Sequence, residues 1–401
     1  MDSPVVPGVG SPLRHHALIM KKKVYYVANF YMPYEKAYGI QVAKMCEALV
    51  EAGVDITLIV PSRGPQGSLK KFYGLRVEIP TLWLPTLDLE EYDRFGYVFM
   101  ALTFSISYFF FLWYKWLLGE RFVLYTIDAD QYSSSALALI PVPLFSEMHG
   151  GKLNTCATRL LFSRLRGVMA INRIIISELK DTFPHSPARY IAEPNGVDLA
   201  MFSPQEKSQA RIKLGLSLEE PIMLYIGRFY EWKGLEIIPR AAALSPMIRW
   251  QMVGDTRERF ADVVKESLPE NLHFAGGRPY GEMPTWIAAA DAVLVLGTKR
   301  DEQSYRWTSP MKLFECLATG RPIVASATPA IKDAIATGAA LLYEPDNAED
   351  LADKARQAVT PSAQTIALVN EALHIAPAHT WSGRAKRVVH FIESTLNEHI
   401  S

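Results

Sequence analysis

The chain has 401 residues, enough for two domains of ordinary size. Its 42 Lys and Arg residues balance 42 Asp and Glu residues, which argues against a general binder of nucleic acid, and a composition of 49% hydrophobic and 21% charged residues excludes a disordered chain. The three cysteines, Cys46, Cys156 and Cys316, have no metal-ligand spacing and cannot form a disulfide framework, which predicts a reducing, cytoplasmic compartment.

The first nineteen residues stand apart from the rest of the chain. Residues 1–10 are rich in Pro, Gly and Val, and no basic start followed by an apolar run marks a secretory signal. We interpret residues 1–19 as a disordered extension, either native or left from cloning.

Short apolar runs alternate with amphipathic stretches along the remaining chain, with a pause near residues 194–204. This alternation predicts an α/β fold with mostly parallel sheets and helices on both faces of each sheet. Strands are expected at residues 24–28, 56–60, 76–79, 122–126, 143–147 and 168–171, and again at 222–226, 250–253, 272–274, 292–296 and 322–325. We therefore predict two doubly wound, Rossmann-like domains, at residues 20–200 and 201–375, facing each other across a ligand cleft.

Two amphipathic stretches are expected to form helices with distinct places in this fold. Residues 40–52 predict the first helix, directly after the first strand and its loop. Residues 382–396, inside a C-terminal segment at 376–401, predict a helix that packs across both domains.

Residues 95–114 contain no charge, and ten of these twenty residues are aromatic. The segment is long enough to span a bilayer. We reject a span, because it would put strands that look like parts of one sheet on opposite sides of the membrane. Two interpretations stay open: a helix buried between the sheet and neighbouring helices, or an amphipathic helix lying in the membrane interface.

The first strand carries no glycine fingerprint of a dinucleotide site, and no Walker loop occurs in the chain. Gly39 lies just before the first helix, where a tight turn alone would explain it. Asp128 and Asp130 have the spacing of a metal-diphosphate motif, but a strand end followed by a helix cap explains them better. We therefore expect no metal site.

The second domain is more informative about chemistry. Its first strand ends at Gly227 and Arg228, and Lys233 follows in a short loop before a helix. Two cations at the carboxyl end of a first strand face the expected cleft, where Arg can bind phosphate oxygens in a bidentate way and Lys acts as a point charge. The alternative is two solvated surface charges.

A helix start follows further along the second domain. Ser309 is a good N-cap and Pro310 suits the first helical position, ahead of Met311. The free N–H groups of such an end can bind a phosphate. Glu315, farther along this mostly apolar helix, can accept two hydrogen bonds from a ribose diol, although pairing with Lys312 is the alternative.

One histidine lies at a strand end of the first domain. His149 follows Glu147 and precedes two glycines, which let a ligand approach the backbone closely. The imidazole can bind a substrate hydroxyl or exchange a proton near neutral pH. A histidine with a purely structural role is the alternative.

Together these stretches resemble the retaining family 4 glycosyltransferases of the GT-B fold. The resemblance covers nearly all of residues 22–396, and the order and spacing of the motifs carry it more than any single motif. The matching stretches are residues 38–41, 147–149, 194–198, 225–228, 233–234, 252–254, 289–292 and 309–322.

The resemblance implies transfer of a sugar from a nucleotide-diphosphate sugar to an acceptor hydroxyl with retention of the anomeric configuration. It implies that Arg228 and Lys233 bind the diphosphate without a metal, and that Glu315 binds the ribose. It also implies that His149 contacts the donor sugar beside the reacting carbon. Gly39, Gly227 and residues 309–311 belong to the implied donor site.

One position departs from the family pattern. The family often has a second Glu eight residues before the ribose-binding one, and Trp307 stands there in this chain. Asp301, Glu302 and Arg306 in the same loop are candidates to contact sugar hydroxyls instead. The departure bears more on which sugar the donor carries than on whether the site binds a nucleotide.

We expect a cytoplasmic, metal-independent hexosyltransferase that acts on a lipid-linked saccharide in cell-surface polysaccharide or glycolipid synthesis, peripheral on the inner face of the membrane through residues 95–114. Five cations from Lys152 to Arg173 would add attraction to anionic lipid if they share that face, whereas a solvated helix face is the alternative. Two other functions fit the fold: a nucleotide-sugar epimerase, and a non-catalytic module that binds a partner or a sugar nucleotide.

Overall fold

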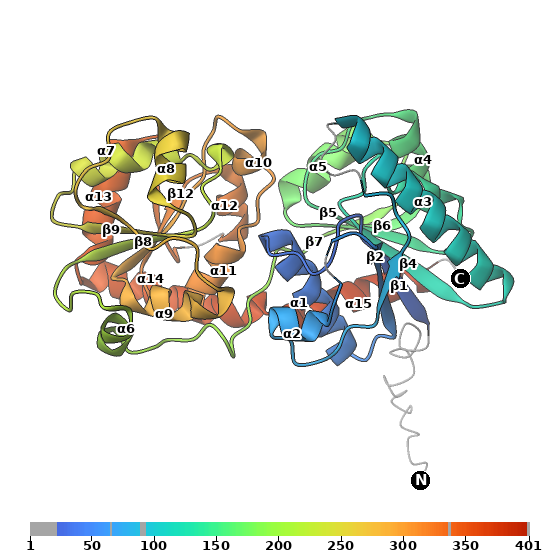
Figure 1. Cartoon of the computed structure of the whole chain (residues 1–401), viewed down its shortest axis with the longest axis horizontal. Helices are drawn as coiled ribbons and strands as arrows, with labels where there is room; N and C mark the ends of the chain where they lie inside the picture. Colours follow the sequence, from blue (N-terminus) through green and yellow to red (C-terminus); the bar gives the residue numbers. More distant parts are fainter. Residues whose placement is uncertain (1–21, 65, 89–93, 336–337, 399–401) are drawn as a thin grey trace, which may run out of the picture.

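The computed structural model describes residues 22–64, 66–88, 94–335 and 338–398, and the extension expected at residues 1–19 lies outside them. Figure 1 shows two α/β domains side by side. Each domain is built on one parallel sheet with helices on both faces. The expectation of two doubly wound domains across a cleft is confirmed.

The first domain has a seven-stranded sheet in the order β3-β2-β1-β4-β5-β6-β7. The strands β1, β4 and β5 are almost wholly buried, as expected of a sheet covered on both faces. The strands are β1 (Lys23–Val27), β2 (Ile56–Pro61), β3 (Thr81–Leu84), β4 (Phe122–Ile127), β5 (Leu144–Met148), β6 (Leu165–Ala170) and β7 (Arg189–Ala192). The helices are α1 (Ala37–Glu51), α2 (Leu69–Tyr73), α3 (Arg94–Leu117), α4 (Cys156–Arg164) and α5 (Arg173–Thr182).

The second domain repeats this architecture with six strands in the order β10-β9-β8-β11-β12-β13. Its strands are β8 (Ile222–Ile226), β9 (Arg249–Val253), β10 (Leu272–Phe274), β11 (Ala292–Val295), β12 (Ile323–Ser326) and β13 (Leu341–Tyr343). Its helices are α6 (Lys207–Leu214), α7 (Ile238–Ala243), α8 (Arg257–Val264), α9 (Met283–Ala289), α10 (Glu302–Tyr305), α11 (Met311–Leu317), α12 (Pro329–Ala334), α13 (Ala348–Val359) and α14 (Ala363–Ile375).

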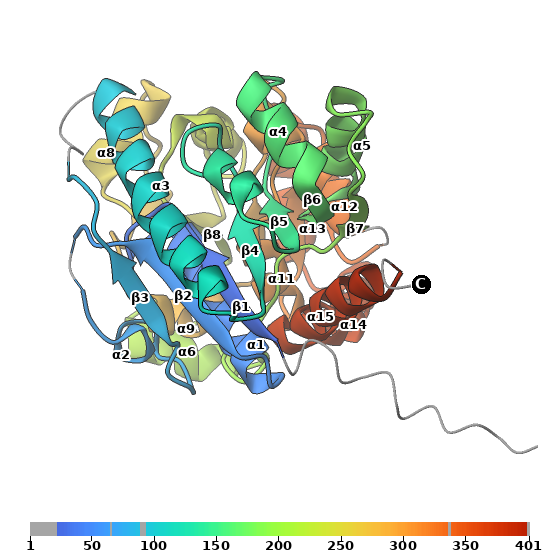
Figure 2. The same ribbon diagram turned by 90° about the vertical axis from the view of Figure 1, so that its right-hand side faces the viewer.

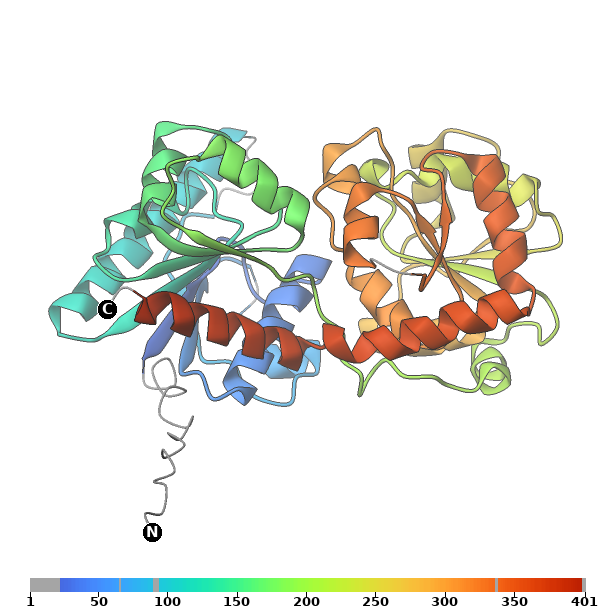
Figure 3. The same ribbon diagram turned by 180° about the vertical axis from the view of Figure 1, so that it is seen from behind.

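The C-terminal helix α15 (Trp381–Asn397) returns to the first domain, where it packs on α1 and β6. Figure 3 shows α14 and α15 running in line along the back of both domains. The chain passes from one domain to the other twice, near Val197 and near Thr380. The two connecting segments are in contact, because Val197 and Thr380 form a parallel β-bridge. The helix expected at residues 382–396 is therefore present, and it packs mainly on the first domain.

The edge of the first sheet differs from the prediction. The strand expected at residues 76–79 is wrong, since the edge strand is β3, which begins after Pro80. The backbone N–H of Arg76 donates to Glu47 at 2.5 Å, and its guanidinium binds Glu51, so this stretch is tied to α1 instead of a neighbouring strand. The short strands β7 and β13 were not predicted.

Helix α3 has one face buried in the core and one exposed apolar face. One face packs into the core through residues spaced four apart: Met100, Phe104, Tyr108 and Leu112. The opposite face is a continuous apolar stripe, 44–70% exposed, which we call the α3 stripe: Phe99, Leu102, Ile106, Phe110, Tyr114 and Leu117. Figure 2 looks onto this side of the molecule, where α3 runs diagonally across the front. Burial in the core thus accounts for only part of the apolar surface of this helix.

Candidate active site

A cleft of about 1790 Å³ separates the two domains. Its lining comes from the loops after β1, β4 and β5 in the first sheet and after β8, β9 and β11 in the second. Doubly wound sheets bind ligands at these carboxyl ends. A pocket for one small ligand measures about 300–1,000 Å³, so this cleft has room for two substrates.

A close backbone contact shapes the second-domain wall of the cleft. Gly227 directly follows β8, and Gly254 directly follows the neighbouring strand β9. A Cβ atom on Gly254 would lie 2.3 Å from the carbonyl oxygen of Gly227, so only glycine fits there. The turn at Gly227 brings Arg228 onto the cleft surface.

Arg228 and Lys233 both line the cleft, as the sequence predicted, and neither forms an ion pair with an acid among the residues that the structure describes. The Lys233 ammonium lies 5.5 and 5.4 Å from the ring centroids of Tyr230 and Trp232. Burial first, and then the nearby charge of Lys312, lower the pKa of Lys233 from 10.5 to about 8. These cations therefore form a positive site that lacks a counter-charge.

Glu315 lies behind the cleft wall and is 1% exposed. Its Oε1 accepts from the Tyr280 hydroxyl at 2.7 Å, and its Oε2 accepts from the Lys312 ammonium at 2.8 Å. Tyr280 and Lys312 themselves line the cleft. A ribose diol can reach this carboxylate only if one of the two side chains turns away, and the pairing with Lys312 considered as the alternative is present.

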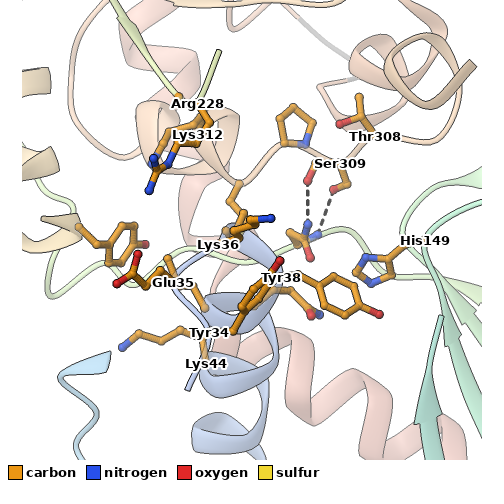
Figure 4. A pocket seen from close by; sticks show the side chains of 18 of the residues that line it. Tyr34, Glu35, Lys36, Tyr38, Lys44, His149, Arg228, Thr308, Ser309 and Lys312 are labelled. Carbon is orange, nitrogen blue, oxygen red and sulfur yellow. Dashed lines mark hydrogen bonds between the residues drawn. The ribbon is translucent and has the colours of Figure 1, made fainter. Parts of the chain in front are cut away.

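The predicted N-cap role of Ser309 is wrong. Helix α11 begins at Met311, and Pro310, the residue before it, is extended and makes no side-chain cap. The Ser309 hydroxyl and carbonyl instead accept from the backbone N–H and the side-chain amide of Asn195, at 3.1 and 2.7 Å. Figure 4 shows this pair of bonds beside the cleft. Residues 309–311 line the cleft, and here they also join α11 to the crossing between the domains.

His149 lies on the first-domain wall of the cleft, opposite Arg228 and Lys312 (Figure 4). Its Nε2 is 2.7 Å from Oε1 of Glu147. Burial alone would raise the pKa of Glu147, but Arg384 and then His149 lower it to about 2. An ionised carboxylate only accepts hydrogen bonds, so Nε2 donates and a neutral His149 keeps Nδ1 as an acceptor.

Glu147 is the centre of a buried network. Its Oε1 also accepts from Gln41 and from Arg384 of α15, each at 2.7 Å, and its Oε2 accepts from Tyr125 at 2.7 Å. Arg384 is fully buried and donates to the backbone carbonyl of Pro194 as well, at 2.9 Å. The C-terminal helix thus fixes the carboxylate that orients His149.

Gly39, Asp128 and Asp130 have structural roles near the cleft. A Cβ atom on Gly39 would lie 2.3 Å from the Tyr34 carbonyl and 2.6 Å from the Tyr73 hydroxyl, so the residue is needed where α1 begins. Asp128 pairs with Lys152 at the end of β4. Asp130 accepts a hydrogen bond from the backbone N–H of Tyr132 in the next turn, at 2.6 Å. Such a bond is expected if these aspartates mark a strand end followed by a helix cap.

Trp307 joins the two domains. Its indole N–H donates to Glu178 of α5 at 2.6 Å, and Arg306 pairs with the other oxygen of Glu178 at 2.6 Å. The ring also covers Gly151, where a Cβ atom would lie 3.0 Å from it. The position that holds a carboxylate in the resembled family therefore carries a contact between domains here.

The three replacements considered for the missing Glu do not line the cleft in the described part of the chain. Asp301 caps α10 by accepting from the backbone of Ser304 at 3.1 Å. Glu302 lies 3.6 Å from Arg306, which is already paired with Glu178. The cleft lining at this loop comes instead from Gln303, Ser304, Trp307 and Thr308.

The structure thus gathers Arg228, Lys233, residues 309–311 and His149 around one cleft, whereas Gly39 and Glu315 are buried and do not line it. Sequence reasoning missed Lys36 and Arg384. Lys36 lines the cleft from the start of α1, with its ammonium over the Tyr34 ring at 5.3 Å. Arg384 had a detectable signal, since it interrupts the apolar stripe of an amphipathic helix.

Comparison with known proteins agrees with this geometry. Residues 220–360 match the family model described as glycosyl transferases group 1. D-inositol 3-phosphate glycosyltransferase from Nocardioides sp. is 27% identical over 245 residues, which cover 55% of this chain and 52% of that protein. The chain spans about half the length of the curated relatives that it matches.

Two solved structures share the fold over nearly the whole chain. Sucrose-phosphate synthase from Thermosynechococcus elongatus superposes with a TM-score of 0.75 at 19% identity, covering 94% of this chain and 100% of that one. Anabaena HepE, solved in complex with UDP and glucose, superposes with a TM-score of 0.67 at 17% identity, covering 93% and 100%. These similarities identify the GT-B fold.

Proposed function

We propose, from the premise that this chain is a GT-B protein with a group 1 glycosyltransferase domain at residues 220–360, that it transfers a sugar from a nucleotide-diphosphate sugar to an acceptor hydroxyl with retention. The observation that carries the proposal is the positive site without a counter-charge at the end of β8, facing His149 across the cleft. Binding of UDP and glucose by HepE supports a sugar nucleotide as donor.

Arg228 and Lys233 stabilise the leaving group in this proposal. As the glycosidic bond breaks, negative charge develops on the diphosphate, and preorganised cations in a partly dry cleft stabilise that charge without a metal. The acceptor hydroxyl attacks from the face that the diphosphate leaves, and a phosphate oxygen takes its proton. Attack on that face keeps the anomeric configuration.

His149 positions the donor sugar. With Nε2 held by Glu147, Nδ1 accepts a hydrogen bond from a sugar hydroxyl. The edge of the Tyr38 ring lies against the imidazole, with ring centroids 5.6 Å apart, and limits its rotation. The two contacts place one acceptor nitrogen at a fixed point beside the leaving group.

The affinity for a nucleoside diphosphate is expected to fall as the pH rises above about 8. Below this pH Lys233 is protonated, and above it the neutral amine loses its attraction for phosphate. The Kd should then rise by up to about tenfold per pH unit between about pH 8 and pH 9.5. Lys233→Arg stays charged and should bind without this dependence, so an equal fall in that variant would assign the titration to another group.

Glu315→Gln is expected to weaken donor binding by at least about tenfold, with a smaller loss for a 2′-deoxy donor, because a hydrogen bond to a charged group contributes about 1.5–3 kcal/mol. Gln keeps one acceptor and presents a donor that mismatches a diol. Titration of both proteins with ribo- and deoxyribonucleotides measures the difference. Equal penalties for the two donors would mean that Glu315 only holds Tyr280 and Lys312 in place.

Incubation with UDP-, GDP-, ADP- and CDP-sugars tests the proposed activity. Transfer or slow hydrolysis of one donor supports a glycosyltransferase. An isomerised sugar would indicate an epimerase, for which the cleft offers His149 but Asp128 and Asp130 only in paired form. Binding without turnover would indicate a non-catalytic module, the function that Trp307 favours.

The proposal places the protein on the inner face of a membrane, in the cytoplasm, where it extends a lipid-linked saccharide for cell-surface polysaccharide or glycolipid synthesis. The α3 stripe supports this location, because a long exposed apolar face suits the membrane interface. Two of the five cations from Lys152 to Arg173 already form ion pairs with acids. Lys152 pairs with Asp128, and Arg173 pairs with Asp333 of the other domain at 2.6 Å.

The wild-type protein is expected to float with anionic vesicles, and the double variant Ile106→Glu, Phe110→Glu to stay at the bottom of the gradient. Both side chains are exposed on the α3 stripe, so two charges should prevent insertion without disturbing the core. Met247→Glu is a matched control, since it charges an exposed apolar side chain on the second domain. Wild-type protein that stays at the bottom would remove the membrane from the proposal.

A further inference from the structure

Arg63 is a buried cation on the first-domain side of the cleft. It follows β2 by two residues, lines the cleft and is 8% exposed. It lies on the opposite domain from Arg228 and Lys233. Because the second domain holds the proposed donor site, Arg63 belongs to the half of the cleft left for the acceptor.

The guanidinium of Arg63 has no strong partner among the residues that the structure describes. One terminal nitrogen contacts the Met100 sulfur at 3.1 Å, and a thioether is a weak acceptor. The Nε atom is buried and has no hydrogen-bond partner, and no acid forms an ion pair with the group. A buried charge in such a place is costly unless something compensates it.

Asp130, an acid that also lines the cleft on the first domain, already has hydrogen-bond partners. The Tyr97 hydroxyl donates to Asp130 at 3.3 Å; burial and then the charge of Asp130 raise the pKa of Tyr97, and Arg63 opposes this rise. The other oxygen of Asp130 accepts from the backbone N–H groups of Tyr132 and Ser133 at 2.6 and 2.8 Å. Asp130 therefore stabilises the turn that contains it and does not form an ion pair that would compensate the charge of Arg63.

The surroundings of Arg63 fit an anion attached to an apolar group. The ring of Tyr31, another cleft residue, lies 3.0 Å from a Cβ position on Gly64. Met100 lies on the buried face of α3, next to Phe99 on the α3 stripe. Tyr97, in the first turn of α3, also lines the cleft, so Arg63 lies near the N-terminal end of the helix that carries the α3 stripe.

We propose that Arg63 binds a phosphate group of the acceptor, and that this phosphate links the acceptor saccharide to a lipid that follows the α3 stripe. The inference rests on the proposed function, and it adds the chemical class of the acceptor. Arg suits this role because its planar fork binds phosphate oxygens in a bidentate way.

Binding of farnesyl diphosphate tests the site, with farnesol and inorganic pyrophosphate as comparisons and with a tight nucleoside diphosphate filling the donor site. The wild-type protein should bind farnesyl diphosphate at least about tenfold more tightly than farnesol, the difference expected for one charge-assisted contact. Arg63→Met should remove this preference and Arg63→Lys should keep part of it. Equal affinity of inorganic pyrophosphate would support the phosphate site and overturn the lipid link.

Two controls separate this site from other effects. Lys71→Met removes an exposed cation that also lines the cleft on the first domain and should leave the preference unchanged. Arg63→Met should not lower Tm, because it removes a buried charge that lacks a partner, whereas a structural arginine would lower it. The inference is overturned if Arg63→Met keeps the preference for farnesyl diphosphate over farnesol, or if the wild type shows no such preference. Nucleoside diphosphate binding, measured on the same proteins, reports separately on the proposed function.

Discussion

Replacing Arg228 with Ala is expected to reduce turnover by on the order of 10²–10³, the effect of removing one preorganised charge-stabilising donor. Lys233→Ala should cost a similar factor, because both cations face the same point of the cleft without a counter-charge. The loss should appear in kcat as well as in donor affinity, since the charge on the diphosphate grows as the bond breaks.

Folding should be little affected in either variant, because Arg228 is exposed, Lys233 is only half-buried, and neither forms an ion pair with an acid among the described residues. Lys299→Ala is a matched control, a cation of the second domain that is 56% exposed and lies outside the cleft. Initial-rate measurements with the donor identified by screening give the comparison. Full activity of Arg228→Ala would show that the diphosphate binds elsewhere.

Replacing Arg384 with Met is expected to destabilise the protein by about 3–5 kcal/mol, because breaking a buried ion pair leaves an uncompensated charge. Arg384 opposes the rise that burial alone would cause in the pKa of Glu147. Without it the carboxyl should be protonated at much higher pH, and the hydrogen bond that orients His149 should be altered. Denaturant unfolding measures the stability, and kcat reports the positioning of His149.

Two further variants make this prediction specific. Arg189→Met breaks an exposed pair with Glu398 at the other end of α15 and should change stability little. Adding Glu147→Gln to Arg384→Met should recover part of the lost stability, because it removes the uncompensated charge. If Arg384→Met unfolded like the Arg189 variant, the buried pair would not hold α15 to the first domain.

The sheets could be predicted because their strands are buried on both faces and read as continuous apolar runs. The prediction of a strand at residues 76–79 was wrong for a related reason. An apolar residue can be buried in a loop that packs on a helix as well as in an edge strand, and this stretch is tied to α1. The edge strands β3, β7 and β13 were missed, whereas the edge strand β10 was predicted at residues 272–274. Local sequence therefore predicted the centres of both sheets and only one of their four edges.

The candidate site likewise contains residues that local sequence predicted and contacts that it missed. Arg228, Lys233 and His149 follow buried strands, so the topology of a doubly wound sheet places them at the cleft. The partners of Ser309 and Trp307 lie more than a hundred residues away, at Asn195 and Glu178. No local pattern reports such contacts between domains, and the same holds for the pairing of Arg384 with Glu147.

Calorimetric titration of the wild-type protein with UDP, UMP and uridine, repeated for the G, A and C series, tests most directly whether this cleft binds a nucleoside diphosphate. For one base the diphosphate should bind at least about tenfold more tightly than the monophosphate, and the double variant Arg228→Ala, Lys233→Ala should lose that preference. Equal affinities for diphosphate and monophosphate in every series, or a preference that survives in the double variant, would contradict the assignment.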